Sequence, residues 1–188
     1  MLRIISGSLR GRKLADSSKY KDIRPTTDRN RQALFNVITS GKFLQELDFN
    51  LVGANILDLC CGTGSFAIEA ISRGSKYALC IDNNRDHLNL VQKNAENLGI
   101  KDFIGTKFID AANLSSISDS DRYDLIFIDP PYSYEIEKII DSLLKNDLVK
   151  ENCLVVTESA KDLDFINLKK LDSRKYGITY FGFFTKLS

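Results

Sequence analysis

The sequence predicts an α/β fold: a doubly wound, mostly parallel sheet of seven strands with a small basic N-terminal extension. Short apolar segments alternate with segments of helical periodicity from residue 54 onward, a pattern typical of parallel sheets. Several apolar segments end at an acidic residue, and such sheets bind ligands at the carboxyl ends of their strands. The length of 188 residues, with 43% hydrophobic and 27% charged residues, suits one soluble domain.

The first helix is predicted to begin after the segment 25–28, Pro-Thr-Thr-Asp. The proline restricts the backbone that leads into the helix, and the threonine or aspartate can cap the free amide groups of its first turn. Apolar residues then recur at helical spacing, and Gly41 is the expected stop. Arg29 and Arg31 fall in the first turns, where the helix dipole disfavours cations. Their placement favours a functional reason, such as an anionic ligand.

From residue 54 the expected strands and helices alternate. Each strand is an apolar run, and each helix carries apolar residues three or four positions apart. The expected strands cover residues 54–60, 77–81, 108–109, 123–128, 153–157, 168–174 and 178–186. The expected helices cover residues 65–73, 85–98 and 136–144. The last two strands flank Gly177 and should form a hairpin, so one strand runs antiparallel to its neighbours.

The N-terminal extension is the basic part of a chain whose formal net charge is only +1. Residues 1–31 contain nine Lys or Arg and three Asp, a net charge of +6. A basic arm on a mildly acidic body is a candidate surface for a polyanion, although a solvated charged segment explains the charge equally well. Residues 1–27 are assigned to this extension, with a hairpin expected, and residues 28–188 to the main domain. If residues 9–13 are extended, Arg10 and Arg12 point the same way.

The loop after the first strand contains two glycines. The segment Asp58-Leu59-Cys60-Cys61-Gly62-Thr63-Gly64-Ser65 joins an apolar strand to a helix. The backbone can therefore come close to a ligand beside the free amides of the helix. A tight strand–helix turn needs the same glycines, so this loop alone is weak support for a ligand.

Acidic residues at the next two strand ends strengthen the ligand interpretation. Asp82 lies 18 residues after Gly64, near the spacing at which a carboxylate binds a ribose hydroxyl in nucleotide-binding sheets. Asp110 ends the third strand, where an acid could receive the amino group of an adenine ring. Dinucleotide-binding loops have a third glycine where this chain has Ala67, so the ligand need not be NAD. Any one of these acids could instead cap a helix.

These positions resemble the pattern of class I S-adenosylmethionine-dependent methyltransferases, which have an acidic glycine loop and an acid after each of the next two strands. The resemblance implies a Rossmann-like methyltransferase sheet and S-adenosylmethionine as the cofactor. It assigns cofactor binding to Asp58, Cys60, Gly62, Thr63, Gly64, Asp82, Asn83, Asp110 and Ala111.

The segment Asp129-Pro130-Pro131-Tyr132 ends the fourth strand. It resembles the D/N-P-P-Y/F/W signature of enzymes that methylate exocyclic amino nitrogens of bases, or glutamine amides. We expect Asp129 to accept one N–H of the target amine and the Pro130 carbonyl to accept the other. Prolines fix φ and make this turn rigid, and Tyr132 should stack on the base. These four residues are the predicted catalytic group.

The N-terminal segments narrow the resemblance. Arg3-Ile4-Ile5-Ser6-Gly7, Arg10-Gly11-Arg12-Lys13-Leu14, Arg24-Pro25-Thr26-Thr27-Asp28-Arg29 and Ala33-Leu34-Phe35-Asn36 resemble the bacterial 16S ribosomal RNA guanine-N2 methyltransferase family, often called RsmD. The resemblance spans essentially the whole chain. It implies methyl transfer to N2 of a specific guanine in 16S small-subunit ribosomal RNA, with a ribonucleoprotein particle as the expected partner.

The target base must leave its stack, and the extension is expected to hold the surrounding phosphates. The turn at residues 25–27 could instead close over the cofactor or the base. The predicted RNA contacts are Arg3, Arg10, Arg12, Lys13, Arg24, Thr26 and Arg29.

Other functions stay open at this point. An amino methyltransferase could act on adenine in DNA or RNA or on a protein glutamine, although those enzymes more often begin the tetrapeptide with Asn. A nucleotide-binding oxidoreductase is disfavoured by Ala67, and an inert RNA-binding module is disfavoured by the intact Asp129 turn.

Other features of the sequence argue against a membrane-spanning or secreted protein. No apolar run approaches the roughly 20 residues that span a bilayer, and the N-terminus lacks a signal-peptide core. We expect a cytoplasmic monomer without membrane contact or bound metal. His87 lies among polar residues, with no partner evident in the sequence. The cysteines form no C-x-x-C pair and lie in apolar runs, which favours free buried thiols: Cys60, Cys61, Cys80 and Cys153.

Overall fold

The computed structural model describes residues 2–17, 26–117, 122–131 and 134–187. Within these ranges, no helix is both long enough and apolar enough to cross a membrane. The strands are β1 (Asn55–Leu59), β2 (Tyr77–Asp82), β3 (Ile104–Phe108), β4 (Tyr123–Ile128), β5 (Val149–Ser159), β6 (Leu168–Tyr176) and β7 (Thr179–Lys186). The helices are α1 (Asp28–Ile38), α2 (Lys42–Leu47), α3 (Ser65–Ser72), α4 (Arg85–Leu98), the 3-10 helix η1 (Lys101–Phe103) and α5 (Ile136–Lys145).

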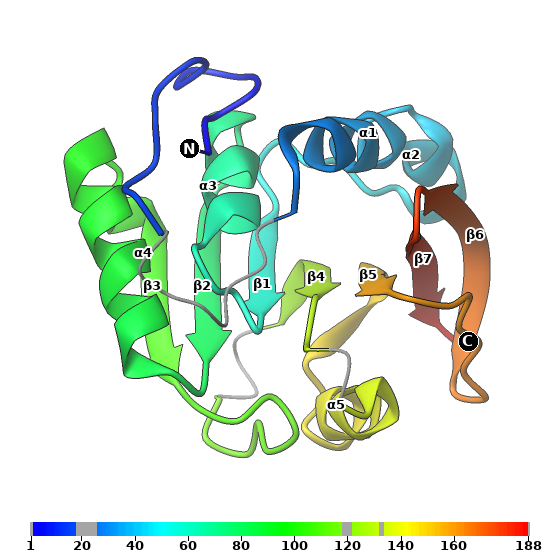
Figure 1. The fold of residues 1–188 in the computed structure, drawn as a ribbon. Helices are drawn as coiled ribbons and strands as arrows, with labels where there is room; N and C mark the ends of the chain where they lie inside the picture. The colour runs from blue at the N-terminus through cyan, green and yellow to red at the C-terminus, as the bar shows by residue number, and fades with distance from the viewer. Residues whose placement is uncertain (1, 18–25, 118–121, 132–133, 188) are drawn as a thin grey trace.

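The strands form one sheet in the order β3-β2-β1-β4-β5-β7-β6 (Figure 1). The pairs β3–β2, β2–β1, β1–β4 and β4–β5 are parallel. β7 pairs antiparallel with both β5 and β6, and the turn between β6 and β7 contains Gly177. The predicted mostly parallel, doubly wound sheet with a closing hairpin is confirmed.

Three elements differ from the prediction. β3 begins at Ile104 rather than residue 108, because residues 105–107 are glycine or polar and lie on the edge strand, where a full apolar run is not needed. β5 includes the polar residues 150–152 before its apolar part. The sequence pattern does not predict α2, and Gly41, with a φ of +83°, precedes this helix instead of ending α1.

The helices cover both faces of the sheet. α1 to α4 lie on one face and α5 lies on the other (Figure 1). Alternate residues of β1 show the division, because Ile56 packs in the cluster with α1 to α4, whereas Leu57 and Leu59 pack in the cluster with α5. With both faces covered, a ligand reaches the parallel strands at their ends.

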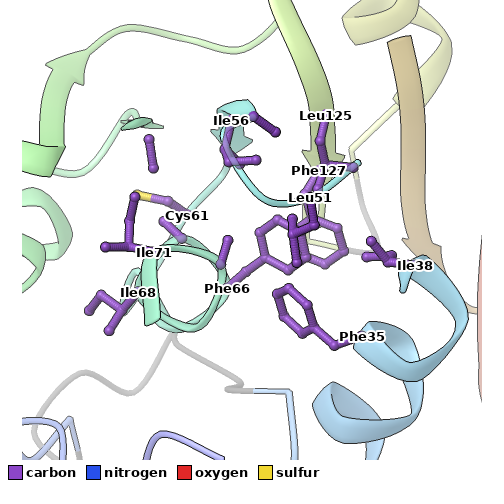
Figure 2. Packing of buried hydrophobic residues seen from close by; sticks show 14 of the residues in the cluster. Phe35, Ile38, Leu51, Ile56, Cys61, Phe66, Ile68, Ile71, Leu125 and Phe127 are labelled. Carbon is purple, nitrogen blue, oxygen red and sulfur yellow. The ribbon is translucent and has the colours of Figure 1, made fainter. Parts of the chain in front are cut away.

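Three stacked phenylalanines join α1, α3 and β4 (Figure 2). The ring centroids of Phe35 and Phe66 are 5.0 Å apart, and those of Phe66 and Phe127 are 4.0 Å apart. All three side chains are buried. Such pairs contribute about 0.5–1.5 kcal/mol each beyond burial of their area. The stack holds α1 and α3 beside the end of β4, where Asp129 follows.

The N-terminal extension contains the expected hairpin in a short form. Arg3 and Lys13 form an antiparallel bridge, and residues 8–11 form turns between them. Residues 9–13 are therefore not a continuous extended segment, and the expectation that Arg10 and Arg12 point the same way loses its basis.

The extension packs on α3 and α4 (Figure 1). The backbone amides of Ile5 and Ser6 donate to the Glu69 carboxylate at 2.8 and 3.0 Å. Gly7 has a φ of +83°, and a Cβ there would lie 1.8 Å from the Ser72 carbonyl oxygen, so glycine is required at this contact. The extension is thus docked on α3 through its backbone.

Arg31 connects the extension to α1. Its side chain is 2% exposed and donates to the carbonyl oxygens of Arg3 at 2.6 Å and Thr26 at 3.2 Å. It also donates to Asp28 Oδ1 at 2.9 Å, and its Nε lies 3.8 Å from Glu69 Oε2. The protein's own carboxylates therefore explain this cation in the first turns of α1, without an external anionic ligand.

Candidate active site

A cavity of about 1040 Å³ lies at the carboxyl ends of the parallel strands. Small-molecule sites usually occupy about 300–1,000 Å³, so the cavity has room for a large ligand. Gly64 is not in its lining but precedes α3, and Tyr132 and Arg24 lie outside the described residues. The predicted residues that do line it are Thr26, Asp58, Cys60, Gly62, Thr63, Asp82, Asn83, Asp110, Ala111, Asp129, Pro130 and Pro131.

The glycine loop turns sharply beside this cavity. Cys60, Gly62 and Gly64 all have left-handed backbone, with φ values of +60°, +50° and +70°. Glycine adopts this conformation freely, whereas Cys60 is strained there. A Cβ on Gly64 would lie 2.9 Å from Val91 Cγ2, so this glycine also lets the loop approach α4.

Asp82 organises the glycine loop from the end of β2. Its Oδ2 accepts from the Gly62 amide at 3.0 Å, and its Oδ1 accepts from the Asn84 amide at 2.9 Å. His87 Nδ1 lies 3.2 Å from Asp82 Oδ1, and His87 Nε2 lies 3.2 Å from Asn84 Nδ2. His87 lines the cavity although no motif in the sequence marks it as a site residue. Its place in the first turn of α4, five residues after Asp82, is the signal that could have found it.

Asp58 is a buried carboxyl group at the end of β1. Its side chain is 1% exposed, and Oδ2 accepts from the Ala67 amide at 3.3 Å. Burial raises the pKa of Asp58 to about 8. The hydrogen bond from Ala67 lowers this pKa, and the charge of Asp82 raises it further. A cation bound in the cavity would offset the penalty of ionising this group.

Asp129 follows the last residue of β4, and Glu158 is the next-to-last residue of β5. The last register pair of these strands is Ile128 with Thr157, so the two carboxyl groups come next on neighbouring strands and line the same cavity. Burial, together with the charge of Glu158, raises the pKa of Asp129 well above its usual range. Burial also raises the pKa of Glu158, whose Oε2 accepts from Thr26 Oγ1 at 2.9 Å. No motif in the sequence points to Glu158.

Tyr134 links the turn after β4 to the end of β3. Its hydroxyl donates to Asp110 Oδ1, and its amide donates to the Pro131 carbonyl at 2.8 Å. Burial and the Asp110 contact raise the pKa of Tyr134 to about 12. Both residues line the cavity, so this contact bridges two of its strand ends. The sequence analysis missed Tyr134, which lies two residues beyond the tetrapeptide.

The family model described as conserved hypothetical protein 95 matches residues 2–185. The chain belongs to this family. A relative, ribosomal RNA small subunit methyltransferase D of Buchnera aphidicola, is 30% identical, and the match covers 94% of this chain and 87% of the relative.

Solved structures share the fold of this conserved hypothetical protein 95 family member. The yhhF protein of Escherichia coli, solved as a candidate methyltransferase, matches with a TM-score of 0.81 and 27% identity, over 98% of this chain and 97% of that one. An RNA methyltransferase of Salinibacter ruber, solved with S-adenosyl-L-homocysteine, matches with a TM-score of 0.64 and 17% identity, over 87% of this chain and 94% of that one. The expected methyltransferase fold is confirmed.

The predicted RNA contacts of this family member occupy different parts of the surface. Arg12 donates to the carbonyls of Asn97 at 2.7 Å and Leu98 at 3.2 Å, so it caps the end of α4. The 14 residues of α4 place that end about 21 Å from the first turn, which lines the cavity. Arg3 pairs with Asp28 at 3.1 Å, close to the start of α1. The exposed residues Arg10, Lys13 and Arg29 do not line the cavity.

The cysteines of this family member are free thiols, as predicted. Three are buried, and Cys60 is partly buried at the cavity. Burial and the surrounding carboxylates raise the pKa of Cys60, so it remains a neutral thiol. Within the described parts of the chain, no group of three or more His, Cys, Asp or Glu is placed to hold a metal ion.

Substitution of Asp82 by Asn should weaken binding of S-adenosylhomocysteine, measured by titration calorimetry. The amide would keep the size but lose the charge that holds the Gly62 amide and faces His87. Hydrogen bonds to charged groups contribute about 1.5–3 kcal/mol, so affinity should fall by roughly 10- to 100-fold.

Asp86→Asn is the matched control for this prediction, because Asp86 is exposed on the same loop-and-helix segment and does not line the cavity. Unchanged affinity in Asp82→Asn would contradict the role of Asp82 in forming the cofactor site.

Proposed function

We propose that this protein transfers a methyl group from S-adenosylmethionine to N2 of a specific guanine in 16S small-subunit ribosomal RNA. The broader statement, S-adenosylmethionine-dependent methylation of ribosomal RNA, rests on family membership and on relatives named ribosomal RNA small subunit methyltransferase D. The observation that carries the finer proposal is Asp129, a partly buried carboxyl group in the cavity beside Pro130 and Pro131.

The charges of the cavity fit this cofactor. Among the described residues, five carboxyl groups line it against two arginines, and burial raises the pKa of Asp58 and Asp129. A ligand that carries a sulfonium and an ammonium group offsets this accumulation of negative charge, whereas the pyrophosphate of a dinucleotide would add to it. The absence of a third glycine at Ala67 agrees with this choice over an oxidoreductase. The solved relative with S-adenosyl-L-homocysteine gives further support.

The residues of the three strand ends would hold the cofactor. The Asp82 carboxylate would accept from ribose hydroxyls, and Asp110 and Ala111 would border the adenine. Asp58 would lie on the side of the cationic groups, next to the glycine loop. S-adenosylmethionine supplies an electrophilic methyl group at this site.

Asp129 would act on the amine that receives the methyl group. The guanine N2 lone pair is delocalised into the ring, which makes it a poor nucleophile. A carboxylate that accepts one N–H concentrates electron density on N2 and stabilises the positive charge that develops there. As the N–C bond forms and the S–C bond of the sulfonium breaks to leave the thioether, N2 must lose one proton, which an Asp129 Oδ atom would accept. The rigid Pro130-Pro131 backbone limits the positions open to the base.

The test is methylation of small ribosomal subunits from cells that lack this gene, with labelled S-adenosylmethionine and mass spectrometry of the nucleosides. We expect N2-methylguanosine at one position of 16S ribosomal RNA. Methyladenosine, or label in a protein glutamine, would reject the guanine assignment. Protein-free ribosomal RNA run in parallel would show whether the assembled particle is the substrate.

We further propose that residues 1–27 contribute RNA contacts, while residues 28–188 hold the cofactor and carry the chemistry. We also propose that the enzyme is a monomer. An enzyme acting on bacterial ribosomal RNA would work in the cytoplasm. Sedimentation of the purified protein with and without the RNA substrate tests the monomer.

Neutralising Lys13 and Arg29 together should weaken RNA binding and reduce its salt dependence. Both side chains are exposed, and Arg29 lies between the cavity-lining residues Thr27 and Asn30. Each lost phosphate contact lowers the slope of log affinity against log salt by roughly 0.7 for single-stranded RNA, so the double glutamine variant should lose about 1.4. Filter binding over a series of salt concentrations measures this slope.

The double substitution Lys76→Gln and Lys101→Gln gives a charge-matched control. Both lysines are exposed, and they precede β2 and β3, at the ends of these strands away from the cavity. Equal slopes in the two double variants would contradict a specific RNA surface at Lys13 and Arg29.

A further inference from the structure

Glu158 faces the same part of the cavity as Asp129. Phe127 and Val156 point toward α1 to α4, so the residues two positions later on the same strands, Asp129 and Glu158, fall on that face as well. Adjacent parallel strands are about 4.8 Å apart, which brings the two carboxyl groups side by side. Each group thus presents acceptor oxygens to the same region of the cavity.

The acceptor capacity of this pair is mostly unused. Glu158 Oε2 accepts from Thr26 Oγ1 at 2.9 Å, which fixes the orientation of the carboxyl group. The described residues offer no other hydrogen bond and no cationic partner to the side chains of Glu158 and Asp129. Partly buried carboxylates with few hydrogen-bond donors around them are destabilised, and N–H donors of a ligand would relieve this penalty. Burial raises the pKa of Glu158, in agreement with this geometry.

Guanine presents two kinds of N–H donor on one edge, the ring N1–H and the amino group at C2. Adenine presents an acceptor at N1, which would meet a carboxylate unfavourably. We propose that Glu158 determines specificity for guanine by accepting N1–H while Asp129 accepts an N–H of the amino group. This inference rests on the proposed function, because it assigns a second contact to the same base.

The alternative is that Glu158 serves only to hold the segment before α1 through Thr26. A purely structural contact with Thr26 would affect the methylation of every target base equally. Recognition of N1–H would affect only bases that carry this donor. The analogue 2-aminopurine separates the two roles, because it keeps the amino group at C2 but has an acceptor at N1.

The experiment compares guanine with 2-aminopurine at the methylated position of 16S ribosomal RNA, ligated and reconstituted into small subunits. The wild type should methylate guanine about 10- to 100-fold faster than 2-aminopurine, relative to the intrinsic reactivity of the two amines. In Glu158→Gln the amide can accept from N1–H or donate to N1, so this ratio should fall to within about threefold of one. Glu151→Gln, an exposed residue of the same strand, should keep the wild-type ratio.

Thr26→Val removes the hydroxyl that contacts Glu158 and keeps the side-chain shape. If recognition belongs to Glu158, this variant retains a preference for guanine that Glu158→Gln has lost. The proposal would be overturned if the ratio of the guanine rate to the 2-aminopurine rate were the same in the wild type and in Glu158→Gln. Equal rates of methylation of guanine and 2-aminopurine by the wild type would also overturn the proposal. This outcome does not depend on whether any variant folds.

The control on unmodified subunits separates the two proposals. Failure of the wild type to form N2-methylguanosine there would refute the proposed function itself. Formation of N2-methylguanosine without any dependence on Glu158 would refute only the specificity assignment.

Discussion

Replacing Asp129 by Ala should lower the rate of methyl transfer by on the order of 100- to 1,000-fold, the usual loss when one positioned electrostatic group is removed from an active site. The variant would lose the proposed acceptor for the target amine and for its proton. The backbone of Pro130 and Pro131 should keep its conformation, because the Pro131 carbonyl still accepts from Tyr134. Single-turnover methylation of small subunits measures the rate.

Cofactor affinity should change little in Asp129→Ala, because the proposed carboxylates of the cofactor site, Asp58 and Asp82, remain. Calorimetry with S-adenosylhomocysteine checks this separation of binding from transfer. Asp141→Ala, an exposed residue of α5, is a suitable control. An Asp129→Ala enzyme with the full rate would remove Asp129 from the mechanism.

The pH dependence should follow the ionisation of Asp129. Burial and the charges of Glu158 and Asp58 raise the pKa of this group, and only its ionised form accepts the proton. The rate should therefore rise with pH through this raised pKa and fall as the group becomes protonated. Glu158→Gln removes a like charge, so the profile should shift toward lower pH. A shift toward higher pH would contradict the coupling of the two groups.

Replacing Glu69 by Ala should destabilise the protein by about 3–5 kcal/mol, the usual effect of removing one partner from a buried ion pair. Glu69 is 1% exposed and accepts from the Ile5 and Ser6 amides. It also binds Arg73 Nε at 2.8 Å and lies 3.8 Å from Arg31 Nε. Without Glu69, the Ile5 and Ser6 amides lose their acceptor, and the buried Arg31 guanidinium loses a nearby negative charge. For a chain of this length the melting temperature should fall by roughly 6–20 °C.

Differential scanning calorimetry measures this loss, and Glu96→Ala on the exposed face of α4 is the control. Hydrogen exchange should also show faster exchange of the Ile5 and Ser6 amides in Glu69→Ala. A melting temperature within about 2 °C of wild type would show that the Glu69 contacts contribute little net stability.

Most of the fold follows from local patterns in the sequence. The apolar runs of β1, β2 and β4 are buried on both faces, so their hydrophobicity alone identifies them. The start of α1 is predicted from Thr27, whose hydroxyl accepts from the Asn30 amide. Edge strand β3 is harder to predict, because solvent contact permits polar residues in it.

The site is predicted where its residues form contiguous motifs, and missed where tertiary contacts bring single residues together. The glycine loop and the turn after Asp129 contain several unusual residues in sequence, so their patterns are visible. Glu158, Tyr134 and His87 each come from an ordinary segment, and only the packing of strands and helices places them at the cavity. Arg31 pairs with two carboxylates: Asp28 lies three positions before it, whereas Glu69 lies 38 positions after it and only the packing of α3 brings it close.

The long-range docking of the extension also sets an order of events during synthesis. Its hydrogen bonds to α3 and to the end of α4 join residues 63 to 86 positions apart in the chain. The ribosome makes the N-terminus first, so this segment has emerged long before residue 98 exists to receive Arg12. The first segment synthesised is therefore among the last to reach its native place, and folding of the sheet region must precede it.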